Sequence, residues 1–226
     1  MSFGADTDYW GFADTNIKLQ SSSKTPSKSE AQCVDSNGDV SASTLYDTYD
    51  EFSCVYRSCD DTALVFYDTA SAVDFRLGKV ISNKVITSIS VSTDNTSRPE
   101  ITIAGRDCAT ADGAVRYFAP TDLEIAGTRT ATPIGASADT VSKVTGSNAT
   151  ASANVAVTLD SNGAESCLDL HGGRVEATVD VVGCTGDAGV SADTGWSDMG
   201  AGLNKENTAY STGSISVFKN LAGSDT

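Results

Sequence analysis

The segment KSEAQCVDSNGDVSASTLYD, from Lys28 to Asp47, decides the fold class, because two alternating strands flank the pair Asn37-Gly38. An Asn-Gly pair in this setting favours a tight type I′ hairpin turn. The expected register sets small residues opposite each other: Cys33 with Ala42, and Ala31 with Thr44. Because small and apolar residues would share one face with Val40, we expect a thin, half-buried antiparallel hairpin.

Alternating segments of the same kind recur along the chain, while strong helix formers are scarce. The clearest strand pair spans Val85 to Asp107, with turn residues between its arms. Further strands are expected at Glu51–Cys59, Ala63–Asp68, Ser152–Asp160, Ser166–Cys184 (two strands turning at Gly172-Gly173) and Ser214–Leu221. Thr69–Gly78 is the helix candidate, because apolar residues recur there at helical spacing before a glycine. About ten strands and at most one short helix predict an all-β fold of two packed antiparallel sheets, as a sandwich or a partly closed barrel.

The tract from Thr128 to Asn154 is rich in Ala, Thr, Ser and Gly, so we expect an extended loop or a weak edge ribbon there. A linker between two small domains is the alternative. Because the strands beyond it resume with unchanged composition, we interpret residues 1–226 as a single domain. The DSNG turn of the first hairpin recurs at Asp160–Gly163, which we attribute to shared turn chemistry rather than to a duplicated domain.

The chain is strongly acidic, with 30 acidic against 15 basic residues among 226 and a net charge of −15. This balance argues against a surface that grips nucleic acid through its phosphates, although nucleic acid could pass such a surface without adhering. We find no export signal and no apolar run of membrane-spanning length, so no membrane partner is expected.

Six cysteines and one histidine are the residues most relevant to metals and disulfides. The cysteines form no CxxC pair, and we expect mostly buried free thiols and no metal site. Disulfides in an exported protein are the alternative reading. The cysteines are Cys33, Cys54, Cys59, Cys108, Cys167 and Cys184.

No arrangement of residues predicts catalysis or a cofactor. His171 directly precedes Gly172-Gly173, where a turn residue is a better explanation than a catalytic base. The acidic residues fall mainly in expected turns, in which Asp bonds its own backbone. The DSNGD segment, Asp35–Asp39, lacks the spacing of an EF-hand and its closing Glu. We therefore expect a non-enzymatic protein.

Three segments together resemble the major tail, or tail tube, subunit of tailed bacteriophages. Ser27–Asp47 resembles the early hairpin of that family, Gly78–Asp107 its central strand pair, and Arg174–Leu221 its closing half, with a long loop around Trp196. The resemblance covers about half of the chain by segments, and hairpin chemistry of this kind is common among β proteins.

The resemblance implies two packed sheets, rings of six subunits whose inner strands join into one barrel, and rings that stack into a tube for DNA. Localisation to a virion tail, assembly in the host cytoplasm, contact with other tail proteins and an acidic lumen are further expectations. The hairpin Lys28–Asp47 would supply lumen or intersubunit strands, and the loops Thr44–Ser53 and Ala188–Asn207 would contact the next ring. The candidate anchors between subunits are aromatic residues: Tyr9, Trp10, Phe12, Tyr46, Tyr49 and Trp196.

Two other classes remain open on the sequence alone. A capsid decoration or head-to-tail connector protein would also be acidic, rich in strands and non-enzymatic. An exported adhesin or sugar-binding module would be favoured if the cysteines formed disulfides. Oligomer symmetry separates the first alternative from a tube subunit, and a count of free thiols tests the second.

Overall fold

The computed structural model describes residues 7–68, 73–108, 115–140, 142–183, 189–204 and 211–224. Within these ranges the chain is all-β, which confirms the predicted fold class, and it contains no helix. The helix expected at Thr69–Gly78 is wrong in its described part, since Val73–Asp74 is a short strand. Two of the apolar residues that suggested a helix lie in strand pairings instead: Val73 pairs with Asp68, and Leu77 bridges Phe118. Residues 69–72 lie outside the described ranges.

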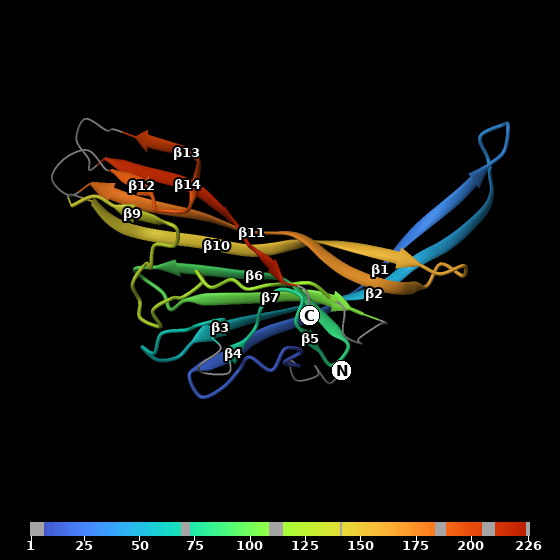
Figure 1. Ribbon diagram of the computed structural model, residues 1–226, viewed down its shortest axis with the longest axis horizontal. Coiled ribbons are helices and arrows are strands. Elements are labelled where there is room, and N and C mark those ends of the chain that lie inside the picture. The colour runs from blue at the N-terminus through green and yellow to red at the C-terminus, as the bar shows by residue number, and fades with distance from the viewer. Residues whose placement is uncertain are drawn as a thin grey trace.

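One large antiparallel sheet dominates the molecule (Figure 1). Its strand order is β1-β2-β7-β6-β10-β11-β14-β13, with β5 pairing beside β6, and three two-stranded sheets (β12–β9, β15–β8 and β3–β4) accompany it. The strands are β1 (Ile17–Val34), β2 (Val40–Ser58), β3 (Tyr67–Asp68), β4 (Val73–Asp74), β5 (Val80–Ile81), β6 (Lys84–Asp94), β7 (Glu100–Asp107), β8 (Tyr117–Phe118), β9 (Ala136–Ala138), β10 (Ser142–Leu159), β11 (Glu165–Gly183), β12 (Val190–Ala192), β13 (Ser197–Asn204), β14 (Thr212–Asn220) and β15 (Gly223–Ser224).

The core lies against one face of the large sheet. Alternate residues of the central strands are buried there, among them Ile89, Ile103 and Val179. The connecting segments supply the opposite layer, for example Trp10, whose indole Nε1 donates to the Ile103 carbonyl at 2.8 Å. Other buried residues of these segments are Phe12, Leu64, Phe66, Leu77, Phe118, Leu123, Ile125 and Ile134. The second layer is therefore built of short sheets and loops, and no barrel closes within the described chain.

The first hairpin has the predicted register but a different turn. Cys33 pairs with Ala42 and Ala31 with Thr44, as expected. The turn spans Asp35–Asp39, because the Gly38 amide donates to the Asp35 carbonyl at 3.1 Å and the Asp35 amide to the Asp39 carbonyl at 2.8 Å. Of the central Asn-Gly pair, only the glycine has a positive φ, 89°, so the turn is not type I′. The strand expected separately at Glu51–Cys59 is the continuation of β2.

Two expectations about the second half of the chain are wrong. Residues 142–154, expected as a loop or weak ribbon, belong to β10, which pairs with β6 on one side and β11 on the other. Small side chains suit this central position, since Ala149 and Ala151 are buried under the covering layer. The turn expected at Gly172-Gly173 is instead an irregularity inside the continuous strand β11, opposite the step from Ser152 to Asn154.

The large sheet contains the same four-stranded unit twice. The first unit is β1-β2-β7-β6 and the second is β10-β11-β14-β13, in the same strand order. The β1–β2 register, from Ile17↔Ser58 to Val34↔Val40, recurs 125 residues later in β10–β11, from Ser142↔Gly183 to Leu159↔Glu165. All three register shifts recur at equivalent positions: after Leu19, Ser27 and Cys33 in the first unit, and after Val144, Ser152 and Thr158 in the second.

The remaining two strands of each unit correspond with an offset of 112 residues. The pair Ser92↔Glu100 of β6–β7 corresponds to the pair Asn204↔Thr212 of β13–β14. The irregularity after Ile86 recurs after Asp198. A hydrogen bond that closes each unit is also repeated, from the Ser58 amide to the Pro99 carbonyl (3.1 Å) and from the Gly183 amide to the Ser211 carbonyl (2.8 Å).

The two DSNG turns are equivalent positions of this repeated unit. Asp35 and Asp160 each accept two turn amides on the carboxylate, at 2.8 and 3.0 Å. The interpretation of the repeated tetrapeptide as shared turn chemistry alone is therefore wrong: the structure contains an internal duplication.

Candidate assembly surface

Both outer strands of the large sheet have an unpaired edge. β1 and β13 stand at opposite ends of the strand order, and neither has a second neighbour among the described residues. The described side chains of β13 are all exposed, and so is most of β1 beyond Leu19. Free edges of this kind are templates for pairing with another chain, and proteins normally cover or close them.

The outer part of the first hairpin forms an exposed arm, which we define as Ser29–Tyr46 (Figure 1, blue). Every residue from Glu30 to Tyr46 is exposed on both faces of the ribbon, so the expectation of a half-buried hairpin is wrong. Three aliphatic side chains on it are about half exposed: Val34 (53%), Val40 (54%) and Leu45 (49%). Because a lone two-stranded ribbon is marginal in water, the arm is suited to receive a partner.

The tip of the second hairpin docks onto the first unit at the base of the arm. The Asp47 amide donates to the Gly163 carbonyl at 3.2 Å. Beside this contact the buried Arg106 guanidinium reaches Glu165 at 2.9 Å and Asp47 at 3.3 Å. The Arg106 guanidinium also lies over the Tyr49 ring, 3.5 Å from its centre. These contacts anchor one unit to the other.

The units also join through the β6–β10 strand pair, which we call the internal joint. Seven consecutive residue pairs form it, from Asp94↔Gly146 to Ser88↔Ser152. On one face a hydroxyl pair, Ser90 with Thr150 at 3.0 Å, crosses the joint. The opposite face belongs to the core.

The sheet face opposite the core, which we call the open face, is lined mainly by small hydroxyl side chains. Six half-exposed examples run across both units: Ser53, Thr102, Ser90, Thr150, Thr178 and Ser216. The arginines on this face are paired with carboxylates, Arg57 with Glu100 (2.9 Å) and Arg174 with Glu176 (3.1 Å). The face therefore offers these two cations to a polyanion only in competition with a neighbouring carboxylate.

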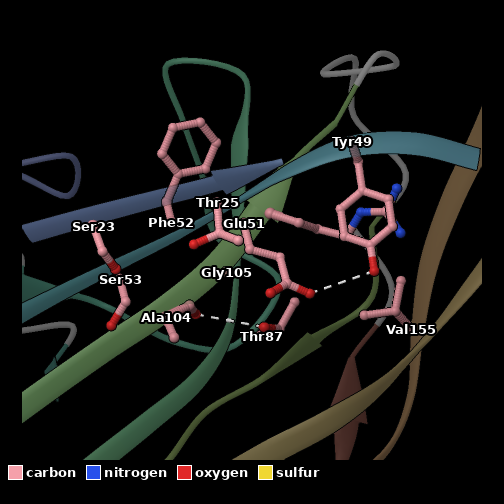
Figure 2. Close-up of a pocket in the computed structure, with 11 residues that line it drawn as sticks. Ser23, Thr25, Tyr49, Glu51, Phe52, Ser53, Thr87, Ala104, Gly105 and Val155 are labelled. Carbon is pink, nitrogen blue, oxygen red and sulfur yellow. Dashed lines mark hydrogen bonds between the residues drawn. The ribbon is translucent and has the colours of Figure 1, made fainter. Parts of the chain in front are cut away.

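A depression of about 360 Å³ lies on the open face near the base of the arm (Figure 2). Figure 2 shows the Tyr49 hydroxyl directed at Glu51, 3.4 Å away, and the Thr87 hydroxyl directed at the Ala104 carbonyl, 3.5 Å away. The lining includes Ser23, Thr25, Ser53 and Val155 but no histidine, cysteine or lysine. The polar groups of the lining are hydroxyls, the Glu51 carboxylate and the Arg106 guanidinium.

Of the six candidate aromatic anchors, five are buried or half-buried within the chain and one is exposed. Trp10 and Phe12 are buried in the core of the chain itself, and Tyr9 packs edge-on against Phe52 at 4.9 Å. Tyr49 stacks on Arg106, and Trp196 lies half-buried beneath Gly135. Tyr46 alone of the six is exposed, at 37%, beside Leu45 at the base of the arm. Sequence reasoning missed Val40 and Phe218 as candidate contacts between copies, because neither stands out without the duplication.

The two loops expected to contact a neighbouring ring are mostly strands. Thr44–Ser53 is part of β2. Within Ala188–Asn207, β12 and β13 occupy most of the described part, whereas Ala188 and residues 205–207 lie outside it.

The described cysteines are free thiols, but three of the five are exposed: Cys33, Cys59 and Cys167. The expectation of mostly buried thiols is therefore wrong for these, and correct for Cys54 and Cys108. Cys184 lies outside the described residues.

Within the described ranges no group of three or more His, Cys, Asp or Glu side chains is placed to hold a metal ion. His171 is exposed and pairs with Asn154 across the β10–β11 ladder. In the same ranges, no helix combines the length and the apolar character needed to span a bilayer. A scan against protein-family models and a search of curated proteins both find no match to the chain.

Proposed function

We propose that the protein is a structural virion protein, a tail tube subunit whose copies join edge to edge into rings that stack into a tube for genome passage. The observation that carries the proposal is a single large sheet with two free edges and an open polar face. Closing such sheets from several copies into a barrel removes every free edge. Its partners would be further copies, other tail proteins and double-stranded DNA that passes without specific binding.

In this proposal the open face lines the lumen. Hydroxyl side chains hydrate well, and arginines already paired with carboxylates are poor ligands for phosphates. The net charge of −15 per chain adds a repulsive field. DNA would therefore pass the wall without being retained, which a conduit requires.

The proposed ring contains six four-stranded units. The resemblance implies six subunits per ring, each contributing its inner strands. Because each chain here carries two such units, three chains supply the six. The proposed ring is thus a trimer of chains with six-fold pseudo-symmetry, in place of the six chains expected from the sequence.

The exposed arm would reach a neighbouring ring or subunit, and its removal tests the proposal. Replacing residues 31–44 with Asn-Gly would join Glu30 to Leu45, which already face each other across the hairpin. Because the arm buries nothing within the chain, we expect this variant to keep its melting temperature. Negative-stain microscopy of concentrated wild-type protein should show rings and tubes, and the variant should lose the tubes.

One outcome would count against a tube subunit, and another would count only against the role of the arm. Discrete wild-type rings or trimers that never stack would favour a capsid decoration or connector protein. Tubes of unchanged length and yield from the shortened variant would show that the arm has no part in stacking.

A further inference from the structure

We infer that copies of this chain join head to tail, with β1 of one copy pairing with β13 of the next in the register of the internal joint. The occupant of each free edge is thus a second copy of the same chain. The duplication carries this inference, because β13 is the equivalent of β6, and β1 is the equivalent of β10. The pairing of β6 with β10 inside the chain therefore shows how β13 and β1 can pair between copies.

The equivalence fixes the register between copies residue by residue. The internal pair Thr150↔Ser90 maps onto Thr25 of one copy and Gly202 of the next. In the same way, Ser152↔Ser88 maps onto Ser27 and Gly200. The new strand pair is antiparallel and continues the open face across the boundary, because register sets which side chains share a face.

The equivalence of the two units also predicts where the arm of one copy contacts the next copy. Within the chain, Gly163 at the second hairpin tip accepts a hydrogen bond from the Asp47 amide. The equivalent residues are Gly38 at the tip of the arm and Gly172 in β11. Both Asp47 and Gly172 have a positive φ, 45° and 64°, so the receiving backbone has the same local shape. The arm of one copy would therefore lie across its neighbour and contact β11 at Gly172.

A second observation, the nature of the side chains at the equivalent positions, supports the same joint. The buried ion pair at the docked tip joins Arg106 to Glu165 at 2.9 Å. The equivalents of these two residues are Phe218 and Val40, so both members of the charged pair are replaced by apolar ones. Val40 is 54% exposed in the isolated chain. A matched change on both sides is expected if Phe218 of one copy packs against Val40 of the next.

Contacts of this kind are heterologous, since each copy uses a different edge toward each neighbour. Repetition gives either a closed ring or an open filament. The inference rests on the duplication and not on a role in phage tails, so the two can fail separately.

Disulfide trapping tests the register. In a background with Cys33, Cys59 and Cys167 changed to Ser, we would introduce T25C and G202C together. Directly opposed strand residues lie at a separation that a disulfide can bridge, and a side chain at Gly202 meets no atom within 4 Å. Mild oxidation with copper–phenanthroline should give a ladder of covalent multimers on denaturing gels.

The matched control is T25C with A201C, because a slip of one residue sends the side chain to the other face of the sheet. Equal ladders from both variants, or none from T25C/G202C at concentrations where the background protein sediments as an oligomer, would overturn the inference. A background protein that stays monomeric at every concentration would overturn it as well. Covalent multimers in a protein that forms no tubes would support the pairing of β1 with β13 and contradict the proposed tube.

Substitutions that copy the Arg106–Glu165 ion pair at the equivalent positions test the proposed contact between Val40 and Phe218. V40E alone should weaken association at least tenfold in sedimentation, because it buries an unpaired charge against Phe218. The triple variant V40E/F218R/R174Y copies Glu165, Arg106 and Tyr49 of the internal contact, and should regain association relative to V40E. An unchanged association constant for V40E, or a triple variant no stronger than V40E despite a native fold by circular dichroism, would contradict the Val40–Phe218 contact.

Discussion

The Arg106 guanidinium lies 3.5 Å from the centre of the Tyr49 ring, where it closes the contact between the two units. In the second unit the equivalent residues are Phe218 and Arg174, which make the same kind of contact at 4.1 Å with cation and ring exchanged. A cation above an aromatic face is attractive in either arrangement. Both units of the chain thus have this contact, with the cation and the aromatic ring at exchanged positions.

Replacing Arg106 with Met should lower the free energy of unfolding by about 3 kcal/mol, because Glu165 would keep a buried charge without its partner. The double variant R106M/E165Q should recover part of this loss, since the orphan charge is removed. Urea denaturation of the wild type and both variants measures the difference. Equal stabilities for the single and double variants would show that the ion pair is not the source of the effect.

Substituting Gly173 with Ala should destabilise the fold by about 1–3 kcal/mol, as overpacking of a core does. A Cβ at this position would lie 2.3 Å from Phe118 Cγ and Cδ1, so the ring must move. Gly146, in the paired strand β10, serves as the control, because its nearest contact would be an ordinary 3.7 Å. Thermal denaturation should show a lower melting temperature for G173A and little change for G146A.

Stability should fall in acid partly through Asp8. Burial acts to raise the pKa of this carboxyl, but hydrogen bonds from the Tyr56 hydroxyl and from the amides of Ala13, Gly11 and Trp10 outweigh it and hold the pKa below its ordinary 3.8. The folded state therefore favours the ionised form. This stabilisation is complete above pH 3.8 and disappears as the pH falls through the lower folded-state pKa.

The variant D8N should be less stable than the wild type at neutral pH, and the difference should narrow below pH 3.8. E30Q, on the exposed arm, controls for the loss of one negative charge. Denaturant titrations at several pH values give both curves. A constant gap between wild type and D8N across the acid range would contradict the assignment to Asp8.

Native-state alkylation should distinguish the described thiols. Cys33, Cys59 and Cys167 are exposed and should react within minutes, whereas Cys54 and Cys108 are buried and should react only after unfolding. Burial also raises the pKa of the Cys54 thiol, which reduces the reactive thiolate further. Mass spectrometry of peptides after timed labelling measures each site. Rapid labelling of Cys54 in the folded protein would contradict the packing of β2 against the N-terminal segment.

The sequence predicted the parts of the fold that depend on local chemistry. Alternation and turn residues located the first hairpin with its register and the strand pair β6–β7. The errors came where tertiary packing decides. Ser142–Asn154 has few large side chains, yet it is a central strand because its small residues fit beneath the covering layer. Val73 and Leu77 have helical spacing, but Val73 pairs with Asp68 in a short strand ladder and Leu77 bridges Phe118.

The duplication was hidden because backbone register, rather than side-chain identity, is what the two units share. Between residues 17–58 and 142–183 only 12 of 42 positions are identical, and the most visible run is the DSNG turn. Asp47 and Gly172 illustrate the difficulty, since unlike residues adopt the same left-handed backbone. The free edges, the arm and the partner positions Val40 and Phe218 became visible only when the two registers were compared.

The internal joint also changes how an assembly of these chains responds to dilution. Every second boundary between units is formed when the chain folds, so its formation is unimolecular and independent of protein concentration. Only the boundaries between chains obey mass action. A ring would therefore fall apart on dilution into intact chains that each keep both units in one sheet, and never into single four-stranded units.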